Sequence, residues 1–306
     1  MQKTAFELKF IHPRYWLLWF GIGLLWLLVT VLPYKALLKL GAGIGKLLMK
    51  IIKKRAKTAV RNLELCFPDY TQQQRDKILQ DHHESLGIAL FETGMAWWWP
   101  QWRLDKLVTF KGLEHIEHAK AQGKGVLLFA THSFCLEIGG RLFSTHMRPT
   151  AVYRPHNNPV MEYLQVSGRI RSTDLIHKRD IRGMIKALNN GQAMWYTSDQ
   201  DFGRRKAVFV PFFGVKYAAT VVGASILTKG SNSDVIPYNV VRNEDGSGYV
   251  IELGAPLKGF PSGDNEQDAI FSNKVIESSI MKAPGQYMWL HRRFKTRPNE
   301  TDPSLY

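Results

Sequence analysis

An uncharged apolar run near the start of the chain limits the possible folds most strongly. Residues 15–32 read YWLLWFGIGLLWLLVTVL, eighteen positions without a charged side chain. A membrane-spanning helix needs roughly 20 apolar residues, with about 17 as the lower limit. Tyrosine and tryptophan near its ends are typical of membrane interfaces. We therefore predict an uncleaved membrane anchor over residues 1–35, with a signal peptide or a buried core helix as alternatives.

Basic residues on the two sides of this run predict its orientation. Three precede it, namely Lys3, Lys9 and Arg14, and a denser series follows it, comprising Lys35, Lys39, Lys46, Lys50, Lys53, Lys54, Arg55, Lys57 and Arg61. The side of a membrane helix that carries more lysine and arginine stays in the cytoplasm. We expect a single crossing, with the main part of the chain in the cytoplasm.

The next segment, residues 36–103, is predicted to be helical and interfacial. Residues 36–54 alternate leucine clusters with lysines at helical spacing, a pattern typical of an amphipathic helix on an anionic leaflet. The GAGIGK within it is no phosphate loop, because Leu47 follows the lysine and no strand precedes the glycines. Residues 71–98 also predict a helix. It closes on AWWWP, whose tryptophans pack in the core or touch lipid.

From about residue 104 onward, strand-like and helix-like runs alternate. LVTFKG, GVLLFAT, TAVYRP, DLIHK and QAMWYTSD are short, β-branched or aromatic, and bounded by turn formers. The runs between them place apolar residues three or four positions apart. Later strands are expected in VFVPFFG, VIPYNVVR and YVIEL. The pattern predicts an α/β domain over residues 104–306, with a mostly parallel central sheet flanked by helices.

A histidine stands where ligands bind in such sheets, beyond the carboxyl end of a strand. His132 ends the buried run VLLFAT, and Glu137 follows five positions later. If His132 lies in the turn after the strand, its ring can fold back over the next helix. Glu137 then accepts a hydrogen bond from one ring nitrogen and leaves the other free as a base. A hydrogen-bonded structural histidine is the alternative.

No protein nucleophile accompanies this pair. The chain lacks a GxSxG elbow. Cys135 has apolar neighbours, which raise the pKa of a thiol and blunt it as a nucleophile. A substrate hydroxyl that attacks an activated acyl group under general-base catalysis fits better.

Segments along the chain carry a more specific signal. HxxxxE after an apolar strand resembles the HxxxxD/E motif of glycerophosphate-type acyltransferases. From about residue 12 to the C-terminus the chain resembles the late acyltransferases of lipid A biosynthesis, the lauroyl- and palmitoleoyl-transferring enzymes of Gram-negative bacteria. The segments that carry the resemblance are HPRYWLLWFGIGLLWL, RNLELCFP, ETGMAWWWP, YRPHNNP, MIKALNNGQAMWY, SDQDFG and QYMWLHRRFKTRP.

The resemblance implies a cofactor-independent, single-span enzyme of the inner membrane that faces the cytoplasm and has a glycerophosphate-acyltransferase-like domain. It moves a fatty acyl chain from acyl carrier protein to a hydroxyl of Kdo-modified lipid IVA. His132 matches the general base, and Glu137 its orienting partner. Arg169 matches a family arginine linked to activity, for which an acyl-oxyanion or a phosphate contact suits guanidinium.

Other positions are candidates for substrate binding. Asp199 and Asp201, in SDQDFG, lie where glycerolipid acyltransferases carry an EGTRS phosphate site that this chain lacks. These two aspartates either contact the substrate or accept the hydrogen bonds of turns and helix caps. Arg154, Arg204 and Arg205 bind phosphate or Kdo carboxylate, or form solvated surface.

The net charge of +15 indicates an acidic partner, and both acyl carrier protein and an anionic lipid satisfy it. We expect no metal site, because HHE and HIEH do not supply a three-ligand zinc signature. We also expect no nucleic-acid partner, because no binding-fold signature accompanies HRRFKTR. The alternatives to a lipid A acyltransferase are an acyltransferase for another glycolipid or a glycerolipid, and a non-catalytic, membrane-anchored binder of anionic lipid.

Overall fold

A computed structural model describes residues 5–205 and 207–306. The start of the predicted anchor, residues 1–4 with Lys3, lies outside this range. The N-terminal part is helical. Its α-helices are α1 (Trp16–Val31), α2 (Tyr34–Ile51), α3 (Lys53–Cys66), α4 (Gln72–Trp98) and α5 (Gln101–Leu104), and its 3-10 helices are η1 (Leu8–Ile11), η2 (Pro13–Tyr15) and η3 (Asp105–Leu107).

The main sheet is mostly parallel, as the sequence predicts. Among the described residues its order is β1-β9-β8-β2-β5-β3-β4. Its strands are β1 (Val108–Lys111), β2 (Gly125–Ala130), β3 (Thr150–Tyr153), β4 (Asp174–His177), β5 (Ala193–Thr197), β8 (Ser233–Arg242) and β9 (Tyr249–Leu253). Only the β8–β9 pairing is antiparallel within this order. The expected α/β class is therefore confirmed.

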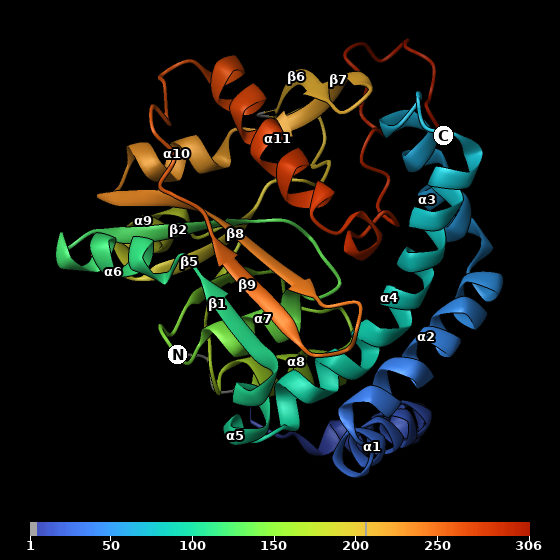
Figure 1. The fold of residues 1–306 in the computed structure, drawn as a ribbon. Coiled ribbons are helices and arrows are strands. Elements are labelled where there is room, and N and C mark those ends of the chain that lie inside the picture. The colour runs from blue at the N-terminus through green and yellow to red at the C-terminus, as the bar shows by residue number, and fades with distance from the viewer. Residues whose placement is uncertain (1–4, 206) are drawn as a thin grey trace.

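Helices cover both faces of this sheet (Figure 1). They are α6 (Leu113–Ala121), α7 (Leu136–Phe143), α8 (Pro159–Arg169), α9 (Ile181–Asn189), α10 (Gly223–Lys229) and α11 (Asn265–Met281), with the 3-10 helix η4 (Pro284–Gln286). The expected strand VFVPFFG forms β6 (Ala207–Phe212), which pairs with β7 (Val215–Val221) in a separate antiparallel sheet. The strand β7 was not expected from the sequence.

The long helix α4 joins the N-terminal helices to the sheet. A capping box of Thr71 and Gln74 starts it. Its Glu92 carboxylate lies 2.6 Å from the Arg242 guanidinium of β8, and both side chains are buried. Figure 1 shows α4 between the sheet and α2. The N-terminal helices therefore share a core with the sheet, and Leu37 of α2 belongs to the same hydrophobic cluster as the β2 strand.

Glycines allow α2 to pack closely on α4. A Cβ at Gly45 would overlap the carbonyl oxygen of His83, and a Cβ at Gly87 would overlap the backbone of α2. The predicted amphipathic helix is thus confirmed as a helix, and its GAGIGK segment serves helix packing. The opposite side of α2 exposes Leu40, Leu47 and Ile51 between lysines.

Helix α1 coincides with the uncharged run. Residues 13–31 are long and apolar enough to cross a membrane by length and composition, and most of their surface is not buried by protein. Of the three tryptophans in AWWWP, Trp97 and Trp99 are buried and Trp98 is half-buried. Core packing, one of the two interpretations above, therefore describes Trp97 and Trp99.

Candidate active site

The register of two neighbouring strands brings His132 opposite an aspartate. Strand β2 pairs in parallel with β5, with Ala130 opposite Thr197. Each strand then ends, and two residues further along each chain segment stand His132 and Asp199. Because carboxyl ends of parallel strands meet at one edge of the sheet, the two side chains come together there.

Asp199 holds His132 through two contacts. Its Oδ2 accepts a hydrogen bond from the His132 backbone N–H at 2.8 Å, and its Oδ1 lies 2.6 Å from Nδ1 of the ring. An ionised carboxylate only accepts, so Nδ1 carries the proton and Nε2 presents a lone pair. Thr197 Oγ1 lies 3.3 Å from Nε2, and in the neutral imidazole with its proton on Nδ1 the threonine hydroxyl is the donor. The imidazole is 22% exposed, whereas the Asp199 side chain is fully buried.

The electrostatics of this pair suit a base. Burial by itself lowers the pKa of His132, but the Asp199 carboxylate more than offsets it, so this pKa lies above its ordinary value. Burial raises the pKa of Asp199, and the charge and hydrogen bonds of His132 lower it further than that, so Asp199 stays ionised. The protonated imidazole is therefore stabilised by its neighbour.

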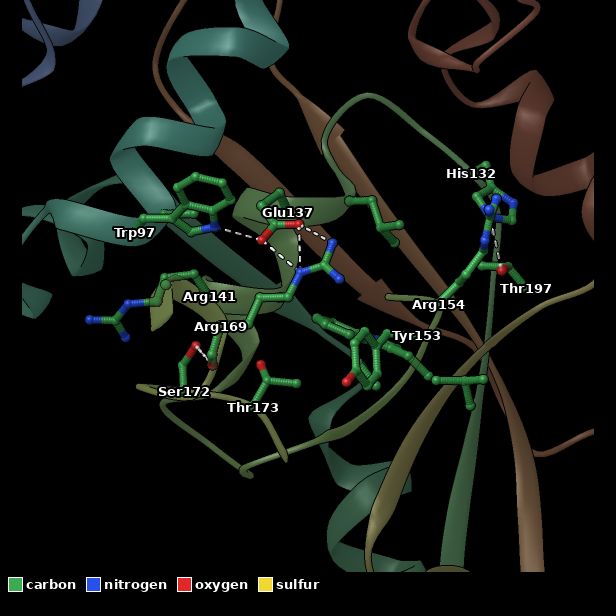
Figure 2. A pocket seen from close by; sticks show the side chains of 17 residues that line it. Trp97, His132, Glu137, Arg141, Tyr153, Arg154, Arg169, Ser172, Thr173 and Thr197 are labelled. Atoms are coloured by element: carbon green, nitrogen blue, oxygen red, sulfur yellow. Dashed lines mark hydrogen bonds and ion pairs between the residues drawn. The ribbon is translucent and has the colours of Figure 1, made fainter. Parts of the chain in front are cut away.

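Glu137 does not pair with His132, so the expected contact between them is wrong. The Glu137 carboxylate instead accepts hydrogen bonds from Arg169 Nε and Nη2, the shorter at 2.6 Å, and from Trp97 Nε1 at 2.8 Å. Figure 2 shows Glu137 turned toward Trp97 and Arg169, away from His132 and Thr197. Arg169 lies at the end of α8 and Trp97 near the end of α4.

The turn between β2 and α7 explains the separation. The segment after η4 fixes this turn, because Met288 N–H donates to the His132 carbonyl at 3.0 Å and Phe134 N–H donates to the Gln286 carbonyl at 2.8 Å. Helix α7 begins only at Leu136. Its first turn faces α4 and α8, while the imidazole faces β5. The spacing of His132 and Glu137 along the chain gave no information about this change of direction, so it could not predict that the two side chains separate.

The Glu137–Arg169 pair is ionised. Burial raises the pKa of Glu137, but the guanidinium of Arg169 and the Trp97 indole lower it more, so the net shift is downward. Burial also opposes the charge of Arg169, and Glu137 reverses this, so the pKa of Arg169 is raised. Arg169 is thereby held at a fixed position, with two of its three guanidinium nitrogens committed to Glu137.

One pocket extends from His132 to the Glu137–Arg169 pair. It has a volume of about 240 Å³, and its wall includes His132, Glu137 and Arg169. The strands β3 and β5 form its floor with Ala151 and Trp195, and the ends of α4 and α8 form its sides. A charged rim beside an apolar floor can hold a polar head group and part of an acyl chain at once.

The remaining predicted binding residues divide into two groups. Arg154 lines the pocket and donates to the Asn157 side chain at 3.0 Å. Arg204 is exposed, bonds to the Pro298 carbonyl, and is not part of the pocket wall. Arg205 is exposed as well.

The two aspartates of SDQDFG do not face the pocket as substrate ligands. Both carboxylate oxygens of Asp199 bind His132. The carboxylate of buried Asp201 accepts from the Gly203 N–H and from the backbone and hydroxyl of Thr296, each at 2.8 Å. The contacts of Asp201 therefore agree with a role in the turn. For Asp199, neither a substrate contact nor a turn contact describes what the structure shows, which is a pair with His132.

Sequence reasoning missed Trp97 and Thr197 as members of the site. Thr197 ends its strand in register with Ala130, so counting from paired strand ends would have found it together with Asp199. Trp97 gave no such signal, because its indole reaches the pocket only through the packing of α4 on α7. Cys135 is buried, and burial raises the pKa of its thiol, which argues against a cysteine nucleophile.

Comparison with known proteins identifies the family. The sequence model of the bacterial lipid A biosynthesis acyltransferases matches residues 3–296. The chain belongs to this family. A lipid A biosynthesis lauroyltransferase of Escherichia coli strain K12 is 47% identical over 98% of both chains. A palmitoleoyltransferase of the same strain is 44% identical over 99% of both chains, and a myristoyltransferase is 26% identical over 97% of this chain and 93% of its own.

This lipid A acyltransferase is therefore an enzyme that acts in lipid A biosynthesis, as the sequence resemblance implies. Membership implies a lipid A acceptor and association with the membrane. The apolar helix α1 agrees with that association.

Proposed function

We propose that this lipid A acyltransferase moves a fatty acyl chain from acyl carrier protein to a hydroxyl of Kdo-modified lipid IVA, with His132 as general base and Asp199 as its orienting partner. The observation that carries the chemistry is the bonded His132–Asp199 pair at the mouth of the pocket. The names of the relatives specify lauroyl and palmitoleoyl transfer and support the transfer of a fatty acyl chain.

The reaction is a single acyl transfer. The acceptor hydroxyl replaces Thr197 at Nε2 of His132 and attacks the thioester carbonyl carbon as Nε2 takes its proton. A C–O bond forms, and the carbonyl oxygen becomes an oxyanion. The intermediate then collapses, the C–S bond breaks, and the leaving thiolate receives the proton from His132. Asp199 stabilises the imidazolium in between.

We assign Arg169 to anion binding in the same pocket. Glu137 occupies Nε and Nη2 of its guanidinium, and this contact aims the rest of the group at the pocket. The oxyanion of the intermediate or a phosphate of the acceptor are the groups that guanidinium would bind there. Glu137 thus acts through Arg169 as a positioning residue. Arg154 contributes a second cation at the rim.

The donor and the location follow from charge. The net charge of +15 attracts acidic acyl carrier protein and the anionic acceptor. We place the enzyme on the cytoplasmic face of the inner membrane, because the lysines and arginines that cluster after the apolar run are attracted to the anionic lipids of the cytoplasmic leaflet. The membrane anchor over residues 1–35, the interfacial segment 36–103 and the separate domain 104–306 stay predictions.

An assay with defined substrates tests this proposal. Purified enzyme in vesicles receives lauroyl- or palmitoleoyl-acyl carrier protein and Kdo-modified lipid IVA, and mass spectrometry measures the acylated product. We expect His132→Ala to lower the rate by about 10²–10⁴-fold, the contribution of a positioned general base. The matched control His118→Ala, at the surface of α6, should leave the rate unchanged. Parallel arms offer a lysoglycerolipid acceptor and acyl-coenzyme A. Equal turnover by His132→Ala, or a preference for the lysoglycerolipid, would overturn the assignment.

A further inference from the structure

Helix α1 presents one side to the protein along its whole length. Tyr15, Leu25 and Val29 are buried on this side, and Leu18, Trp19, Ile22 and Leu28 are partly buried. These positions recur every three or four residues, so they form a continuous stripe on a helix. A helix attached to a domain through one end alone would bury only the residues near that end.

The N-terminal end of α1 packs on α8. Phe10 and Tyr15 form a buried cluster with Val160, and Trp19 packs against it. The rings of Phe10 and Tyr163 lie 5.5 Å apart, and Phe6 lies 5.6 Å from Tyr163. Trp19 Nε1 also donates to the Phe10 carbonyl at 2.7 Å, which fixes the entering chain on the helix.

The C-terminal end of α1 packs on α4 and α5. Val29 lies in one cluster with Met95 and Trp99, and Trp99 Nε1 donates to the Val29 carbonyl at 2.6 Å. The Arg103 guanidinium donates to the carbonyls of Thr30 and Leu32 at 3.3 and 3.0 Å. It thereby caps the helix end from the side of the enzyme body.

These contacts conflict with a perpendicular crossing. Residues 13–31 are long enough to cross a membrane, so the conflict comes from the contacts at the two ends of α1 and not from the length of the helix. With the body on the cytoplasmic side, a crossing would carry one end of α1 to the opposite face. In this fold α8 holds one end, and α4 and α5 hold the other.

The surface of α1 that faces away from the protein is apolar. It exposes Trp16, Leu17, Phe20, Leu24, Trp26, Leu27 and Val31. Phe6, Leu8 and Ile11 extend this surface before the helix, and Leu40, Leu47 and Ile51 are exposed on α2. Exposed basic side chains stand on both sides, with Arg14 before α1 and Lys35 and Lys39 after it. An apolar face bordered by cations suits the boundary of an anionic leaflet.

We propose that α1 lies in the plane of the cytoplasmic leaflet and that the chain does not cross the bilayer. This arrangement replaces the single crossing that the apolar run alone predicts. It rests on the membrane association of the family and on the packing of α1, not on the reaction proposed above. The pocket lies close by, since Trp97 of α4 and Arg169 of α8 line it and both helices contact α1. A lipid acceptor in that leaflet reaches His132 without leaving the membrane.

Cysteine accessibility in spheroplasts tests the topology. Cys66 and Cys135 are buried, so the full chain can carry one added cysteine at a time. Lys9→Cys precedes α1, and the control Glu300→Cys lies near the other end of the chain; both positions are exposed. We expect a membrane-impermeant maleimide to modify neither in intact spheroplasts, and to modify both once permeabilisation and detergent admit it. Labelling of Lys9→Cys in intact spheroplasts would overturn the proposal.

Cross-linking supplies an independent measurement in the same membranes. A permeant bis-maleimide should join Phe6→Cys to Tyr163→Cys, because the two rings are in contact. It should not join Phe6→Cys to the distant control Glu300→Cys. Failure to join positions 6 and 163 in an enzyme that still transfers acyl chains would also overturn the proposal. Conversely, loss of transfer in His118→Ala, or full transfer in His132→Ala, would count against the proposed reaction and leave the topology result unaffected.

Discussion

The proposed role of His132 as a base depends on the contacts of its two ring nitrogens. The Asp199 contact fixes one tautomer, and the second contact, to the His132 backbone, fixes the position of the ring relative to the strand end. Nε2 then faces the pocket with its lone pair in place before any substrate arrives. Little reorganisation is left for the reaction itself, which is a main source of catalytic power in such pairs.

Replacement of Asp199 should change both the rate and its pH dependence. In Asp199→Asn, kcat/KM should fall by about 10²–10⁴-fold, because the tautomer is no longer fixed. The base works only when neutral, and the Asp199 carboxylate raises the pKa of His132. Its removal lowers that pKa, so the acidic limb of the pH–rate profile should move to lower pH. A limb that stays in place would show that Asp199 does not tune the base.

Glu137 should behave differently, because it contacts Arg169 and Trp97 and not the imidazole. Glu137→Gln removes a charge-assisted interaction of about 1.5–3 kcal/mol, so kcat/KM should fall by about 10–100-fold. The acidic limb of the profile should stay where it is in the parent enzyme. Trp97→Phe, which keeps the carboxylate and removes one donor, should show a smaller loss. A limb that moves in Glu137→Gln would restore Glu137 as the partner of His132.

At the residue scale the sequence singled out His132, which we propose as the base, but it predicted Glu137 as the partner where the structure has Asp199. His132 can be found from the sequence alone, because it stands at the end of an apolar run that predicts a strand. The partner could not be found in the same way, because it depends on which strand lies beside β2. Once β5 is known as that neighbour, equal counting from Ala130 and Thr197 leads to Asp199. The nearer carboxylate in sequence, Glu137, belongs to a helix that faces another direction.

At the scale of elements, α2 and α4 are joined by backbone contact. Gly41 and Gly45 face Gly87, where no side chain separates the two helices. The spacing of lysine and leucine predicted the helix, but it gave no information about the partner helix. The glycines, which resemble a phosphate loop on paper, are the residues that set this approach.

Two glycine substitutions on one helix should change stability in opposite directions. Gly45→Ala places a methyl group on the His83 carbonyl and should lower the free energy of unfolding by about 1–3 kcal/mol. Gly43→Ala meets nothing within 4 Å and should raise it by about 0.5–1 kcal/mol, because alanine favours a helix over glycine. Thermal unfolding of both variants in the same detergent measures the difference. Equal midpoints would show that the helices do not pack this closely.

At the scale of the whole molecule, a buried ion pair links the helical part to the sheet. Glu92 of α4 accepts from Arg242 at 2.6 Å and from the Tyr249 hydroxyl at 2.7 Å, and Arg242 also donates to Ser85 at 2.8 Å. The network lies between elements that are far apart in the sequence. Its members look like ordinary charged residues of a helix and a strand, so sequence patterns could not reveal it.

Removal of one member of this ion pair should destabilise the protein more than removal of both members. Glu92→Leu leaves the Arg242 charge buried without its partner and should lower the free energy of unfolding by about 3–5 kcal/mol. Glu92→Leu combined with Arg242→Met removes both charges and should recover a large part of that loss. Chemical unfolding of the parent, the two single variants and the double variant completes a double-mutant cycle. Additive losses would contradict the coupling.

The sequence patterns predicted the α/β fold class, but they did not predict the order of the strands in the sheet. Runs of β-branched and aromatic residues, which favour strands, marked β1–β5, β8 and β9. The order of those strands depends on long-range packing that no local pattern contains. The strand β7, which pairs with β6 in a separate sheet, was not predicted from the sequence.

The contacts of α1 have a consequence for how the protein is made. The helices on which α1 packs, α4, α5 and α8, are all translated after it, and α8 ends only at Arg169. At roughly 5–20 residues per second, the ribosome takes on the order of ten seconds to complete that surface. During this time an eighteen-residue apolar run has left the exit tunnel with no protein to cover it. We therefore expect the nascent chain to meet a lipid surface or a chaperone before its own fold exists.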